Sequence, residues 1–184
     1  MKWVIRIVLG IIFVFVLLVV GVYFYAKKNQ AYSDKKYGFT LLNQTGWYSA
    51  PERQGVYYLV GTKDENSNNI VSTFSVSPIE TLYSLDSQRK YALVGKSCNE
   101  MFTQPDFSPV EVEETSVNRI AGIVCLTENT PSHVNMLYTT KAYTLFNNRG
   151  GKYDYIVTVS YPKDNKLEKE KVNRILNSFR IDLL

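Results

Sequence analysis

The chain has 184 residues, of which 45% are apolar and 14% aromatic, and its formal net charge is +4. A chain this rich in Tyr, Phe and Val can bury a core, so the composition excludes disorder, and the length leaves room for one ordinary domain after an N-terminal segment. Of the 21 basic residues, Lys2 and Arg6 precede that segment, so residues 27–184 carry 19 basic and 17 acidic groups. This balance excludes a nucleic-acid partner, which would require a clustered basic face.

The first element is an apolar run from Ile7 to Ala26 that contains no charged residue. A helix of this length extends about 30 Å, which is the thickness of the hydrocarbon core of a bilayer. The run is longer than the apolar region of a cleaved signal peptide, and bulky Phe24 stands where a cleavage site needs a small residue. We therefore predict a transmembrane anchor in residues 1–26, in contact with lipid through residues 7–26, and favour an uncleaved anchor over a cleaved signal peptide.

The residues after the anchor are polar. Residues 27–36 include Lys27, Lys28, Lys35 and Lys36 and predict a juxtamembrane linker, with the globular domain in residues 37–184. Basic residues stand on both sides of the apolar run, so the positive-inside rule leaves the orientation of the anchor open.

The first half of the domain has the pattern of a β-meander. Segments 38–44, 55–62 and 69–77 are rich in Val, Tyr, Phe and Thr and are separated by turn residues, which predicts three strands. A helix is expected at about 85–102, because apolar residues recur there at helical spacing and either Ser84 or Asp86 can cap its start. Pro105 and Pro109 prevent this helix from continuing.

The second half has the pattern of further strands and a closing helix. Residues 110–113 alternate as a half-exposed strand, and residues 120–126 are apolar throughout, as in a central strand covered on both faces. Residues 137–146 and 153–161 predict two strands joined by a turn. A last helix should begin near Asp164 or Asn165, with an apolar stripe of Val172, Ile175, Leu176 and Phe179. The order of elements predicts an α+β fold in which an antiparallel β-sheet is sandwiched between helices.

The two cysteines, Cys98 and Cys125, are candidates for a disulfide. Cys98 lies on the helix face predicted to meet the sheet, and Cys125 lies on the predicted central strand. In an oxidising compartment they could pair, which would stabilise the fold by about 3 kcal/mol. In a reducing compartment they would be small buried apolar residues, so both alternatives stay open.

Other motifs were weighed as sites. His133 is the one histidine and has no partner at metal-ligand spacing. Gly95-Lys96-Ser97 matches the end of a P-loop motif, but it lies near the end of a predicted helix rather than at a helix start. Ser87-x-x-Lys90 matches the S-x-x-K motif of penicillin-recognising enzymes, but the K-T-G motif that accompanies it there does not follow. Glu111, Glu113 and Glu114 could offer oxygen ligands to Ca²⁺, but an alternating strand more often carries such residues as a solvated edge. We therefore predict no catalytic, cofactor-binding or metal-binding residue.

Several segments resemble the PsbP-like family. They are a strand that leads into a Gly-Trp turn (Gly38–Leu41, Gly46-Trp47), the start of a later strand (Asn118–Gly122), a late hairpin (Lys141–Tyr143, Lys152–Val157) and the terminal helix (Val172–Phe179). The resemblance covers most of residues 37–181. The chain is more similar to the bacterial membrane-anchored members of the family than to the plant form, and the Ran-binding nuclear import factor shares the family's fold. It implies a PsbP-like α/β/α domain, a non-enzymatic binding or assembly role, and a position outside the cytoplasmic membrane.

These observations predict a membrane-tethered, non-catalytic binding or assembly module that faces the extracytoplasmic side of the cell membrane, with no cofactor. Its expected partner is an envelope protein. The alternative is a carrier of a small ligand or lipid, held between sheet and helix in a pocket lined by some of the fourteen tyrosines. A hydrolase ranks below both.

Overall fold

A computed structural model of the chain describes residues 10–22, 31–49, 57–61, 70–82, 85–102, 107–130, 136–148 and 150–182. Residues 10–22 form an apolar helix whose side chains are all exposed. Within the described residues, no helix is both long enough and apolar enough to cross a membrane. The anchor expected at residues 7–26 extends outside the described range on both sides.

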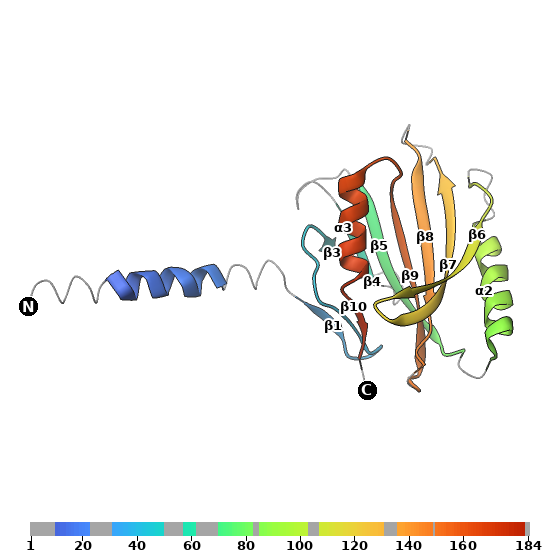
Figure 1. The fold of residues 1–184 in the computed structure, drawn as a ribbon, viewed down its shortest axis with the longest axis horizontal. Coiled ribbons are helices and arrows are strands. Elements are labelled where there is room, and N and C mark those ends of the chain that lie inside the picture. Colours follow the sequence, from blue (N-terminus) through green and yellow to red (C-terminus); the bar gives the residue numbers. More distant parts are fainter. Residues whose placement is uncertain are drawn as a thin grey trace, which may run out of the picture.

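The largest element is an antiparallel sheet of seven strands in the order β3-β4-β5-β9-β8-β7-β6 (Figure 1). Its strands in chain order are β3 (Tyr48–Ser49), β4 (Tyr57–Gly61), β5 (Ser72–Glu80), β6 (Glu111–Val117), β7 (Ile120–Asn129), β8 (Tyr138–Leu145) and β9 (Tyr153–Pro162). Strands β3 to β5 form one meander and β6 to β9 form a second. The two meanders meet where β5 pairs with β9, so the last strand of the large sheet lies near its middle.

Alternation along the strands divides the side chains between the two faces of this sheet. On β9, Tyr155 and Val157 belong to the main core, whereas Ile156 packs against a second, smaller cluster. On β7, Val124 belongs to the main core, and Cys125 to the smaller one. The sheet therefore has a buried cluster on each face.

The main core lies between the sheet, helix α3 (Lys166–Leu176) and a small sheet of three strands. Asn165 caps α3, because its side-chain oxygen accepts a hydrogen bond from the Glu168 N–H at 3.2 Å. The small sheet has the order β1-β2-β10, with β1 at Tyr32–Asp34, β2 at Phe39–Leu41 and β10 at Phe179–Ile181. Strand β1 lies in the segment expected to be a linker, and Phe179 belongs to β10 rather than to the preceding helix.

The opposite face of the sheet carries helix α2 (Ser87–Met101). The side chain of Asp86 accepts a hydrogen bond from the Arg89 N–H at 2.8 Å, which confirms Asp86 as the cap. Figure 1 shows α2 in green near β6 and β7, and α3 in orange-red near β5. The α+β class and the large antiparallel sheet are as predicted, whereas the small sheet was not expected. Strand β7, expected to be central, lies next to the edge but is covered on both faces by the two clusters.

Candidate functional site

Helix α2 rests on the sheet along one narrow stripe. Val94, Cys98 and the capping residue Phe102 are buried, which is the i, i+4, i+8 spacing of one helix face. The apolar residues beside this stripe are not covered, since Leu93 is 43% exposed and Met101 is 45% exposed. A helix that buries so narrow a stripe leaves an opening along each of its sides, and the two openings differ in chemistry.

The first opening, which we call the α2 groove, lies between α2 and the sheet and has a volume of about 280 Å³. Its walls are mainly aliphatic, and Glu80, Ser97 and Thr144 supply the polar side chains. The apolar lining residues come from β5, the connection to α2, the helix, β8 and β9: Ile79, Leu82, Leu93, Val94, Met101, Ala142 and Ile156. The groove therefore suits an apolar group and offers few hydrogen-bond partners.

The two cysteines lie in the wall of the α2 groove. The structure joins Cys98 of α2 to Cys125 of β7 in a disulfide, with their Cα atoms 6.0 Å apart. This separation is within the usual range for a disulfide, and both residues are almost fully buried. The bond would fasten α2 to the sheet at the middle of its buried stripe.

The second opening, which we call the edge cleft, lies between α2 and strand β6. Gln88, Tyr91, Ala92 and Glu114 line it, with a volume of about 350 Å³. A hollow of about 220 Å³ adjoins it, since Tyr91 and Glu114 also line that hollow together with Lys90 and Phe146. The Tyr91 hydroxyl donates a hydrogen bond of 2.6 Å to the Val112 carbonyl of β6. Most of the residues that line the edge cleft carry a polar group, whereas most of those that line the α2 groove do not.

A buried carboxylate holds the first residues of the connection between β5 and α2. Asp154 of β9 is 1% exposed and accepts hydrogen bonds from the Leu82 N–H and the Asn147 N–H, each at 2.7 Å. The Thr81 hydroxyl donates a third, longer bond of 3.3 Å. Asp154 thus joins the connection that leads into α2 to the turn between β8 and β9. Such a satisfied buried acid has a structural role.

The tyrosines that could have lined a ligand pocket lie elsewhere. Tyr57, Tyr143, Tyr155 and Tyr161 belong to the main core on the α3 side, and no tyrosine of the described residues lines the α2 groove. Burial raises the pKa of Tyr57, Tyr143 and Tyr155 to about 12. Tyr155 donates to the carbonyls of Tyr37 and Gly38, so its hydroxyl is also satisfied. The α2 groove is therefore not the tyrosine-lined pocket expected for the carrier alternative, since its walls are aliphatic.

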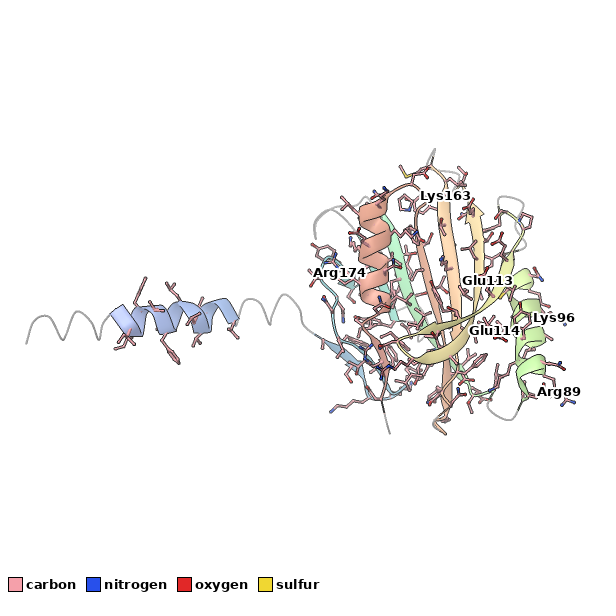
Figure 2. All side chains as sticks on the ribbon, viewed as in Figure 1. Arg89, Lys96, Glu113, Glu114, Lys163 and Arg174 are labelled. Carbon is pink, nitrogen blue, oxygen red and sulfur yellow. A yellow bond between two sulfur atoms is a disulfide. The ribbon has the colours of Figure 1, made fainter. Side chains whose placement is uncertain are left out.

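The remaining motif residues are scattered. Gly95, Lys96 and Ser97 lie in the second half of α2, Ser87 begins that helix, and His133 lies outside the described residues. Glu111, Glu113 and Glu114 are exposed on β6, and Figure 2 labels two of them. Across the described ranges, no three His, Cys, Asp or Glu side chains are grouped closely enough to hold a metal ion.

Comparisons with known proteins bear on the fold. No protein-family profile matches this sequence, and no curated protein is similar to it. Solved structures do match: a Bacteroides thetaiotaomicron protein has a TM-score of 0.59 at 8% identity, over 85% of this chain and 49% of that protein. This chain thus spans about half the length of the Bacteroides protein.

Two further solved structures match over nearly their full length. One is LpqN, described as involved in cell envelope biogenesis of Mycobacterium tuberculosis, with a TM-score of 0.56 and 13% identity over 86% of this chain and 95% of LpqN. The other is the Saccharomyces cerevisiae Ran-binding protein Mog1p, with a TM-score of 0.53 and 10% identity over 83% of this chain and 95% of Mog1p. The chain therefore shares the fold of LpqN and Mog1p. At these identities the likeness concerns the fold alone.

Sequence reasoning identified Cys98 and Cys125 as neighbours, but it missed both openings beside α2. Leu93 gave a signal, because it is apolar and lies outside the predicted face that carries Val94 and Cys98. Met101 was expected on that buried face, but it is 45% exposed. The bond between Tyr91 and the Val112 carbonyl left no signal, since it joins a side chain to the backbone across 21 residues.

Proposed function

We propose that this chain is a membrane-tethered, non-catalytic module that binds or assembles with a protein of the cell envelope on the extracytoplasmic side. The observation that carries the proposal is the α2 groove, an apolar hollow with Leu93 and Met101 exposed on its helix side. Exposed apolar groups around a hollow are typical of protein contact sites. One protein of the same fold is named for binding Ran, and another for envelope biogenesis.

The proposed tether is the N-terminal segment. Residues 10–22 form a helix with apolar side chains on all sides, which in water would be unfavourable and in lipid would be stable. We propose that the helix continues through residues 7–26 as an uncleaved anchor and that the domain of residues 37–184 follows a short linker at 27–36. Strand β1 shortens the free part of that linker, because it pairs with β2.

Site-specific photocrosslinking of the full chain in its own membranes tests the partner. A benzophenone amino acid at Met101, beside the α2 groove, should capture one defined envelope protein. The matched control is the same amino acid at Leu167, which is 77% exposed on α3 across the sheet. Equal capture at both positions would count against the α2 groove as the docking site.

Two further measurements test the tether. Alkaline carbonate should leave the full chain in the membrane fraction, and a dual topology reporter fused after Leu184 should report from outside the cytoplasm. Release by carbonate would refute the anchor, and a cytoplasmic reporter signal would refute the orientation.

A second candidate function is carriage of a small apolar ligand or lipid, which the aliphatic lining of the α2 groove favours over a polar ligand. Native mass spectrometry of the full chain in neutral detergent should then reveal a bound molecule. The variant with Leu93→Glu and Met101→Glu should lose it, because both side chains lie in the groove wall. Adducts that are equal in the two proteins would be lipids held by the anchor and would exclude a ligand in the groove.

A further inference from the structure

Strand β6 is one edge of the large sheet, and among the described strands it pairs only with β7. Asn118 and Arg119, with φ of 53° and 67°, form the two-residue turn that joins them, so the flanking pair Val117 and Ile120 is hydrogen-bonded. Bonded and non-bonded pairs then alternate along an antiparallel ladder. It follows that three residues of β6 direct their backbone N–H and C=O groups away from the sheet: Val112, Glu114 and Ser116.

The edge cleft leaves room beside these outward groups. Its lining includes Gln88 and Ala92 of α2 and Glu114 of β6, so a cleft separates the helix from this part of the edge. The Tyr91 hydroxyl already donates to the outward carbonyl of Val112. This contact shows that the edge accepts a donor from the side of the cleft, in the place where an added strand would offer an N–H.

The side chains along this edge are acidic. Glu111, Glu113 and Glu114 are exposed, and they form no ion pair with any other described residue. Glu111 and Glu113 share the sheet face of Val117, while Glu114 points to the α2 side. Opposite charges on neighbouring strands attract and like charges repel, so an added strand with basic side chains would fit best.

We propose that the edge of β6 binds an extended, basic segment of a protein partner as an additional strand within the edge cleft. Its backbone groups would pair with those of Glu114 and Ser116, and one of its N–H groups would replace the Tyr91 hydroxyl on the Val112 carbonyl. Basic side chains at alternate positions would lie beside Glu111 and Glu113, and small apolar side chains would enter the cleft. This inference shares with the proposed function only the assumption of a protein partner, and it concerns a different surface from the α2 groove.

Peptide binding by the full chain in neutral detergent tests the proposal. The probe is a short fluorescein-labelled peptide of alternating Lys and Val, and the control is a peptide of the same length with alternating Glu and Val. Fluorescence anisotropy should show binding of the basic peptide that weakens as salt is added, because exposed charge pairs are screened. Equal binding of the two peptides would refute the role of the glutamates.

Two variants at one position separate backbone pairing from charge. Glu114→Pro removes an outward N–H but leaves the ladder with β7 intact, and proline is tolerated on the open side of an edge strand. It should weaken binding roughly tenfold or more, whereas Glu114→Gln keeps the N–H and should weaken it only about two- to threefold. Equal affinity of the two variants would mean adhesion by charge alone and would overturn strand addition.

Tyr91→Phe gives an independent test with the opposite sign. It removes the hydroxyl donor from the Val112 carbonyl, so the peptide should bind more tightly than to the unmodified protein. Hydrogen exchange needs no variant: on adding the peptide, the amides of Glu114 and Ser116 should exchange more slowly. Unchanged exchange at both amides would overturn the proposal, as would a dimer of the full chain that hides this edge from the peptide. Crosslinking at Met101 would still test the α2 groove.

Discussion

Replacement of both cysteines by alanine should lower the free energy of unfolding by about 3.5 kcal/mol. Cys98 and Cys125 are 27 residues apart in the sequence, and a cross-link over that distance removes about 12 cal/mol/K of chain entropy from the unfolded state. Both residues are buried, so alanine also removes some packing. Reduction of the unmodified protein avoids this second effect and isolates the contribution of the bond.

The assay is urea unfolding of the full chain in neutral detergent, followed by near-ultraviolet circular dichroism. With an m-value of about 2 kcal/mol/M, a loss of 3.5 kcal/mol lowers the midpoint by roughly 1.8 M. Dithiothreitol should shift the unmodified protein by nearly this amount and leave the double variant unchanged. If dithiothreitol shifts neither protein, or if the unreduced unfolded chain titrates with two free thiols, Cys98 and Cys125 are not bonded and the reasoning fails.

Three other perturbations have defined outcomes. Asp154→Ala leaves two buried N–H groups without an acceptor and should lower the free energy of unfolding by about 3 kcal/mol in the same urea assay. A loss below about 1 kcal/mol would show that water replaces the carboxylate. Gly122→Ala would drive a Cβ into the backbone carbonyl of Thr144 in the neighbouring strand, so thermal unfolding should begin several degrees lower than in the control Gly95→Ala, whose Cβ meets open space. Burial raises the pKa of Tyr155 to about 12, above its unfolded value near 10, so the protonated phenol favours the folded state and stability should fall as the pH rises from about 10 towards 12. Absorbance at 295 nm should show that part of the tyrosine signal appears only in a late cooperative transition that coincides with unfolding, and the absence of this late transition would contradict the reasoning.

The regular parts of the fold could be predicted because their signals are local. The alternation in 153–161 gives β9, and the stripe of Val172, Ile175 and Leu176 gives α3, with the cap one residue before the helix. The pairing of strands was harder to predict from the sequence. Tyr32–Asp34 is short and polar, and it becomes a strand only because Phe39–Leu41 lies beside it.

Strand β10 shows that a local periodicity can also predict the wrong element. Phe179 continues the helical spacing of α3, but the chain leaves the helix after Leu176, and Phe179 pairs with Leu41 instead. A periodicity of a few residues cannot distinguish one further helical turn from a strand that enters the same core. The candidate site depends still more on tertiary structure, since the α2 groove combines side chains from β5, α2, β8 and β9.

The pairing of β10 with β2, and of β9 with β5, has a consequence for the order in which the chain can fold. A ribosome completes β2 long before residues 179–181, and β5 long before 153–162, so neither sheet can close while synthesis is in progress. Folding dominated by such distant partners is slow, because the loop must be closed before any contact forms. The domain should therefore remain open until nearly all of it has been made, which is the state in which a polypeptide can be threaded through a membrane pore.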